Sequence, residues 1–279
     1  MKKLIVTLLA MTLALASAYA QDMAKATETA KLANEALVNG DYDTAYTGFK
    51  EALSLASACG EEGEELVATC QNVLPSIVNA MARKAIRSKD YDMALSLLDQ
   101  AVSLATEYGV DEEAVKAKEL IPQAKMSKAN DYLNDKKFAE AAALYREILE
   151  ADATNGVVAL RLGMALQSGG DLAGAEEAYK LAAENGQDVA ANRQLGTMYL
   201  KKAASALKGK NYKEALVTAV KSAEVCATAN AYKIAGTAAN ALGRKSEAIE
   251  YLSKYLEMSP SAGDAAQIQA AIDQLKTQK

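Results

Sequence analysis

From about residue 24 onward, apolar residues recur three or four positions apart and polar residues fill the intervening positions. Ala45, Phe49 and Ala52 show this spacing, which places them on one face of a helix. Alanine and leucine supply most of the apolar residues, while the chain has two phenylalanines and no tryptophan. Strands draw more heavily on Val, Ile, Thr and aromatic residues. The pattern therefore predicts an all-α protein.

The predicted helices are separated by a short turn block that recurs along the chain. Each block carries Gly, Lys, Asp or Asn at the turn, then usually an aromatic residue or leucine, and it ends in alanine. The final alanines are separated by 49, 47, 34, 40 and 33 residues. The blocks occupy residues 40–45, 89–94, 136–141, 170–175, 210–215 and 243–248. Each block ends one helix and begins another, so the chain is expected to consist of helix-turn-helix units.

A unit of about 34 residues that pairs two helices resembles the tetratricopeptide repeat. The series Leu162, Gly163, Leu166, Ala175 and Tyr179 fills the small and bulky positions of that family. Matching positions in the last unit are Tyr232, Gly236, Ala248, Leu252 and Pro260. The resemblance implies a right-handed α-solenoid in which neighbouring units stack to bury their apolar faces. It divides the chain into six repeats over 21–260 and a C-terminal capping helix with a tail over 261–279.

Two departures from the regular unit have structural consequences. The signature Leu195-Gly196-x-x-Tyr199 lies seven residues earlier than its turn block requires, which predicts a first helix two turns longer. Pro75 and Pro122 each lie 19 residues before the alanine of their block. The second and third repeats are therefore expected to begin with elongated helices that are kinked or broken at proline, unless a separate short helix stands there.

The first twenty residues follow a different pattern. Lys2 and Lys3 precede an apolar run over 4–16, and Ala18-Tyr19-Ala20 has the small residues that a signal peptidase accepts. The run is shorter than the roughly 20 apolar residues that span a membrane. These features predict a signal peptide over 1–20 and an exported protein, periplasmic or secreted.

The chain offers little catalytic chemistry. It has no histidine, the commonest general base and metal ligand. No phosphate loop, dinucleotide glycine pattern or nucleophile elbow is present. The acidic runs at 61–65 and 111–113 are interpreted as solvated helix starts, because no calcium-loop spacing accompanies them. We therefore predict no enzymatic activity, no catalytic, cofactor-binding or metal-binding residues, and no cofactor.

Charge and cysteine content bear on two further properties, nucleic-acid binding and disulfide formation. There are 31 Lys and Arg against 36 Asp and Glu, a formal net charge of −5, without the basic excess of a nucleic-acid binder. Cys59, Cys70 and Cys226 would meet an oxidising compartment after export. The helical register places Cys70 opposite residues near Leu53 rather than Cys59, so we predict buried thiols rather than a disulfide.

Members of the resembled family bind extended peptides or partner helices on the concave face formed by their first helices. In this sequence, many of the positions expected on that face are occupied by asparagine, arginine or lysine. Their side chains can form hydrogen bonds with a peptide backbone or a carboxylate. The predicted partner-binding residues are Asn34, Asn79, Arg83, Arg87, Asn130, Asn134, Arg161, Arg193, Lys201, Lys233 and Asn240. The family's carboxylate clamp is incomplete, because the position four residues before Asn34 is Ala30 rather than lysine.

The leading hypothesis is a non-enzymatic scaffold or chaperone-like adaptor in the cell envelope. It would bind an extended or acidic polypeptide, centred on Arg83, Arg87 and Asn130. One alternative is a small-molecule or glycan-binding protein, which requires a pocket with stacking aromatic side chains. Another is a hydrolase, which requires two buried carboxylates facing each other across a cleft. Self-association is compatible with each hypothesis.

Overall fold

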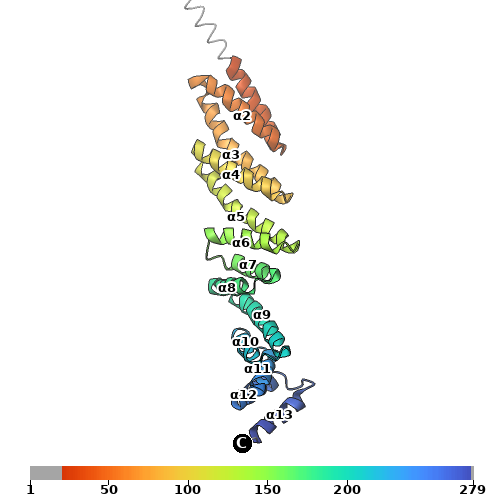
Figure 1. Cartoon of the computed structure of the whole chain (residues 1–279). Coiled ribbons are helices and arrows are strands. Elements are labelled where there is room, and N and C mark those ends of the chain that lie inside the picture. The colour runs from red at the N-terminus through yellow and green to blue at the C-terminus, as the bar shows by residue number, and fades with distance from the viewer. Residues whose placement is uncertain (1–20, 278–279) are drawn as a thin grey trace, which may run out of the picture. The chain divides into compact units, whose positions relative to one another are not determined.

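The computed structural model describes residues 21–277, and within that range it contains helices and turns but no strand. The predicted all-α class is confirmed. A first helix covers residues 21–38, and the predicted signal peptide over 1–20 lies outside the described residues. The remaining helices, labelled in Figure 1 where there is room, are α2 (Tyr42–Ala58), α3 (Glu64–Arg87), α4 (Tyr91–Tyr108), α5 (Asp111–Asn134), α6 (Phe138–Ala151), α7 (Gly156–Gly169), α8 (Leu172–Ala182), α9 (Asp188–Lys208), α10 (Tyr212–Val225), α11 (Ala229–Ala241), α12 (Lys245–Met258) and α13 (Ala265–Thr277).

The chain forms two compact units, one ending at Asp131 and the other beginning at Tyr132. In the first unit α3 packs against both α2 and α4. In the second, α7 packs on α8, α9 on α10 and α11 on α12, and α13 packs against α12. Within each unit, helices that are consecutive in sequence are thus neighbours in space, which is the architecture of an α-solenoid.

The turn blocks have one backbone conformation in common. In each of the six blocks, one residue between the helices has a positive φ, from 59° to 90°. This conformation lets the chain reverse within two or three residues, and glycine adopts it without the steric cost that a side chain brings. Glycine occupies the position in three blocks and lysine in the other three: Gly40, Lys89, Lys136, Gly170, Lys210 and Gly243.

Side-chain caps start several of the second helices. The Asp41 carboxylate accepts a hydrogen bond from the Thr44 backbone N–H at 3.3 Å, and Asp171 accepts one from Gly174 at 2.9 Å. Such caps satisfy backbone donors that have no partner inside the helix. The Asp or Asn of the turn block therefore explains where these helices begin.

Small residues lie where the paired helices cross. A Cβ built on Gly163 of α7 would stand 2.5 Å from ring atoms of Tyr179 on α8. The same atom on Gly236 of α11 would stand 2.6 Å from Leu252 Cγ on α12. As predicted, a small residue on one helix faces a bulky residue on its partner, and this pairing lets the two backbones approach closely.

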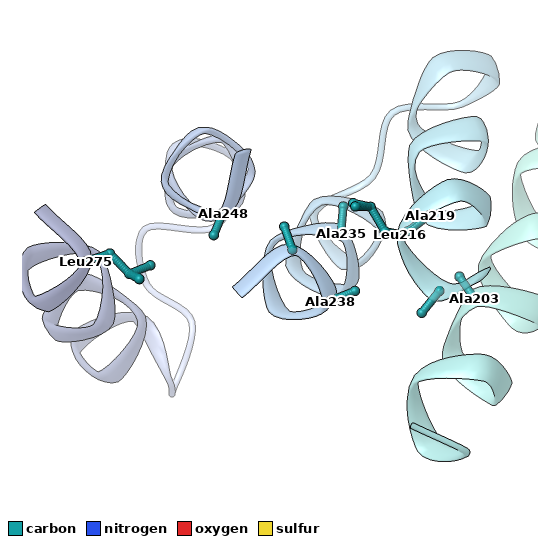
Figure 2. Packing of buried hydrophobic residues seen from close by; sticks show 9 residues of the cluster. Ala203, Leu216, Ala219, Ala235, Ala238, Ala248 and Leu275 are labelled. Carbon is teal, nitrogen blue, oxygen red and sulfur yellow. The ribbon is translucent and has the colours of Figure 1, made fainter. Parts of the chain in front are cut away.

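Stacking in the second unit buries a continuous set of small side chains. Figure 2 shows this core between successive helices, with Leu275 of α13 on the last helix. Its buried members are Ala203, Ala215, Leu216, Ala219, Ala235, Ala238, Ala239, Ala248 and Leu275. Because members come from α9, α10, α11, α12 and α13, no single helix pair could bury this surface by itself.

The elongated helices are present and continuous. Pro75 lies inside α3 and Pro122 inside α5, and each helix has 24 residues. Neither is broken at proline, and no separate short α-helix stands there; a 3₁₀ turn at Gly60–Gly63 precedes α3. Helix α9 has 21 residues against 14 in α7, which confirms the lengthening by two turns.

The cysteines, all within the described residues, carry no disulfide bond. The predicted burial is confirmed for Cys59 and Cys70, whereas Cys226 is only half-buried. Cys70 belongs to the cluster that includes Ala52, and Leu53 packs against this cluster, as the helical register predicts. Among helices within residues 21–277, none has an apolar stretch long enough to cross a membrane.

Candidate functional site

The predicted first-helix face of the first unit is only partly accessible. Arg83 and Arg87 on α3 are exposed, and Asn34 on the first helix is exposed as well. Asn79 is different, because only 2% of its surface is exposed. Its amide nitrogen donates to the Glu113 carboxylate at 2.7 Å and to the Glu113 backbone oxygen at 3.1 Å. The prediction that Asn79 contacts a partner is therefore wrong: its amide joins α3 to the start of α5.

Glu113 is held in its charged form by this contact. Burial raises the pKa of its carboxyl group, but hydrogen bonds from Lys116 and Asn79 and the nearby charges of Lys116 and Arg83 outweigh burial, and the pKa lies below its ordinary value of 4.5. Because the pKa is lowered in the folded chain, the contact contributes its full stabilisation at pH values above 4.5. The stabilisation is lost as pH falls through the lowered pKa.

We expect acid to weaken the first unit partly through Glu113. Between about pH 5 and pH 3, Glu113→Gln should lose less stability than the unchanged chain, because glutamine does not titrate and its oxygen still accepts from Asn79. Urea unfolding followed by circular dichroism at a series of pH values measures this. Glu119→Gln, which removes an exposed carboxylate of the same helix, should leave the pH profile unchanged. Equal profiles for E113Q and E119Q would contradict the assignment.

In the second unit, two predicted residues line one groove. It lies between α9 and α11, which are the first helices of two successive repeats. Its volume is about 380 Å³. Lys201 and Lys233 belong to its wall. Its remaining lining is mostly apolar: Leu200, Ala204, Leu207, Asn230, Ile234 and Thr237. The groove thus combines apolar surface with an amide and two ammonium groups.

Lys233 is already paired. Its ammonium lies 2.5 Å from an Asp264 carboxylate oxygen and 5.5 Å from the centre of the Tyr255 ring. The Tyr255 hydroxyl also donates to Asp264. These contacts tie the residue before α13 to α11 and α12. Lys201 and Asn230 are both exposed on the wall, whereas the charge of Lys233 has a structural partner.

A larger cavity lies mainly on another face of α9, and Lys201 lines both this cavity and the groove. It has a volume of about 660 Å³ and is formed by the end of α7, the start of α8, α9 and α10. Successive helix residues are about 100° apart, so Met198, Lys202 and Ser205 face away from Leu200 and Ala204 of the groove. The cavity lining comprises Gln167, Leu172, Ala173, Glu176, Met198, Tyr199, Lys201, Lys202, Ser205, Thr218 and Lys221.

Electrostatics of this cavity centre on Glu176 and Tyr199. Glu176 accepts from Lys180 at 2.6 Å and from the Tyr199 hydroxyl, and the Lys180 contact is the main cause of its lowered pKa. Burial and the Glu176 contact raise the pKa of Tyr199, so its hydroxyl stays protonated. The Lys221 ammonium lies 5.7 Å from the Tyr199 ring centre. Glu176 therefore stays charged, with both partners in place.

The other predicted residues are spread over the two units. Asn130 is half-buried, and the rest of this set is exposed. Its members are Asn34, Asn130, Asn134, Arg161, Arg193 and Asn240. The sequence prediction missed Asn230 in the groove and Lys202, Ser205, Thr218 and Lys221 in the cavity. The seven-residue lengthening was the available signal, since the added turns of α9 supply part of both walls.

The tyrosines are divided between helix packing and the walls of pockets. Tyr145 and Tyr179 are fully buried in helix packing. Tyr232 and Tyr251 stack on each other, with ring centres 6.4 Å apart, beside a pocket of about 190 Å³. Within residues 21–277, no three potential metal-ligating side chains gather at one point.

No family model and no curated protein matches the chain. Solved structures with similar helix arrangements include the MamA protein, with 17% identity, 69% of this chain and 94% of that chain covered, and a TM-score of 0.36. YrrB, described as a TPR protein with an unusual peptide-binding site, has 18% identity, coverage of 70% and 91%, and a TM-score of 0.38. The C-terminal part of a TPR repeat-containing protein from Cytophaga hutchinsonii has 16% identity, coverage of 85% and 98%, and a TM-score of 0.39. The second and third of these structures are described as tetratricopeptide-repeat (TPR) proteins.

Proposed function

We propose that the chain is a non-enzymatic polypeptide-binding scaffold or chaperone-like adaptor of the cell envelope. The observation that carries this proposal is the groove between α9 and α11, with apolar surface and the exposed side chains of Lys201 and Asn230. An asparagine amide can bond both the N–H and the C=O of an extended backbone. A lysine ammonium pairs with acidic side chains of the bound segment.

The first unit supports an acidic partner. Arg83 and Arg87 are exposed four residues apart on α3, which places them about 6 Å apart along one helix side. Arginine can bond a carboxylate through two parallel hydrogen bonds. We therefore retain Arg83, Arg87 and Asn130 as the proposed contacts of this unit and remove Asn79 from the set.

Three further assignments belong to this proposal. Six repeats span residues 21–260, and the helix after them caps the array. The signal-like pattern of the first twenty residues supports export to the periplasm or beyond. Binding would require little rearrangement, because the groove is formed by helices that already pack together.

Crosslinking in the protein's own cells tests the groove. The double variant Lys201→Ala with Asn230→Ala should lose the polypeptide partners that the unchanged chain captures, as identified by mass spectrometry. Lys208→Ala with Lys213→Ala removes two exposed lysines of the same unit outside the groove and should retain the partners.

A parallel variant tests the first unit. Arg83→Ala, Arg87→Ala and Asn130→Ala together should weaken capture of the same partners. If both the groove variant and this variant capture the same partners in the same amounts as the unchanged chain, the proposal is wrong.

A further inference from the structure

The cavity between α8, α9 and α10 has a composition that differs from the polypeptide groove. One part of its lining is apolar, with Leu172, Ala173, Met198 and Tyr199. Its volume of about 660 Å³ falls in the range of about 300–1,000 Å³ that holds small organic ligands. The cavity is therefore large enough for a compact ligand with an apolar body.

The cavity wall carries an excess of positive charge. Lys201, Lys202 and Lys221 line it against one carboxylate, Glu176. Two wall residues have charged partners outside the lining, Lys180 for Glu176 and Glu214 for Lys202. Including these two partners leaves the excess at two positive charges. That excess stands out in a chain whose formal net charge is −5.

Lys202 and Lys221 can both contact a ligand in the cavity. The Lys202 ammonium lies 3.4 Å from Glu214, but both side chains are substantially exposed, with 55% and 40% of their surface accessible. Exposed ion pairs of this kind contribute little to stability, so Lys202 can leave Glu214 for a ligand at little cost. Lys221 stands over the Tyr199 ring, next to the apolar surface. An anionic group placed between these two lysines would have an apolar surface beside it.

We propose that this cavity binds an amphipathic organic anion, with its acidic head between Lys202 and Lys221 and its apolar body against Leu172, Met198 and Tyr199. The site lies mainly on a different face of α9 from the polypeptide groove, with Lys201 common to both linings, and the proposal does not depend on the proposed function. It arises from the lengthening of α9, since Lys201, Lys202 and Ser205 follow the Tyr199 of the repeat signature.

Calorimetric titration of the full chain with decanoate tests the site. Decanoate should bind and decyltrimethylammonium should not, because the two share an apolar chain and differ in head charge. Added salt should weaken decanoate binding, since the lysines are exposed to solvent. The variant Lys202→Met with Lys221→Met keeps most of the apolar length of both side chains and removes both charges. It should lower the affinity for decanoate about tenfold.

Matched variants separate the cavity from general effects. Lys208→Met with Lys213→Met changes the net charge equally at positions outside the cavity and should change the affinity less than twofold. Ser205→Trp, which fills the cavity from an exposed position, should abolish binding while the circular dichroism spectrum stays unchanged. The proposal is overturned if decanoate does not bind, if decyltrimethylammonium binds equally well, or if K202M/K221M binds as tightly as the unchanged chain.

Discussion

Replacing Tyr179 with alanine is expected to lower the free energy of unfolding of the second unit by about 3–5 kcal/mol. Tyr179 is fully buried, and its ring lies against Gly163 at the crossing of α7 and α8. Its hydroxyl donates to Gln167 Oε1 at 2.6 Å. Alanine would leave a cavity at this crossing, and it would leave Gln167 without this donor.

One milder variant divides this effect, and a second at an exposed position serves as the control. Tyr179→Phe keeps the ring and removes the hydroxyl, so it should cost about 1 kcal/mol. Burial raises the pKa of the Tyr179 hydroxyl to about 12, so its loss should matter equally across neutral pH. Val217→Ala, at a position 57% exposed, should change stability by less than about 0.5 kcal/mol. Guanidinium unfolding followed by circular dichroism measures all three, and a Tyr179→Ala midpoint equal to that of Val217→Ala would contradict the packing described here.

Replacing Gly236 with alanine should destabilise the last helix pair by about 1–3 kcal/mol. In an open helix this change stabilises by up to about 1 kcal/mol, because alanine is the better helix former. Here the added Cβ would stand 2.6 Å from Leu252 Cγ and 3.0 Å from the Leu252 backbone nitrogen. The backbone of α12 would have to move away, and packing around Ala235, Ala238 and Ala239 would loosen with it.

Gly209→Ala gives the opposite sign with the same chemical change. A Cβ at Gly209 would meet its nearest atoms at 3.5 Å and 3.6 Å, which is ordinary contact. Its φ of −77° also suits alanine. We expect this variant to be neutral or stabilising by up to about 1 kcal/mol. Thermal unfolding of both variants gives the comparison, and destabilisation of equal size at the two glycines would count against a tight crossing at Gly236.

The regular part of the fold was predictable from sequence because its signals are local. The turn blocks, the caps such as Asp41 and the small-bulky exchange between Gly163 and Tyr179 each depend on residues close in the chain. The insertion of seven residues also preserves the apolar face, so the length of α9 followed from counting.

The outcome at proline could not be read from the sequence. Pro75 and Pro122 each remove one helix hydrogen bond, a cost that breaks many helices. In the structure Pro75 is buried among residues of α3 that pack on neighbouring helices, such as Leu74 and Ile77. Tertiary packing of this kind keeps the helix continuous, and local propensity does not report it.

The candidate site was predicted less well because periodicity gives a helix face but not what covers it. Asn79 and Arg83 are four residues apart, yet Asn79 is closed off by Glu113 of α5 and Arg83 is open. Lys201 and Lys233 meet in one groove although 32 positions separate them, and only the packing of α9 against α11 reveals it. The pairing of Lys233 with Asp264 depends on the path of the chain before α13.

Position-specific photocrosslinking in living cells tests the polypeptide groove most directly. The photoreactive residue p-benzoylphenylalanine is placed at Thr237 in the groove, or at Val217, which is exposed outside both hollows. Our account predicts discrete polypeptide adducts from Thr237 that are lost when Lys201→Ala and Asn230→Ala are added, and no such adducts from Val217. The same adducts from Val217, or none from Thr237, would contradict the groove as the binding surface.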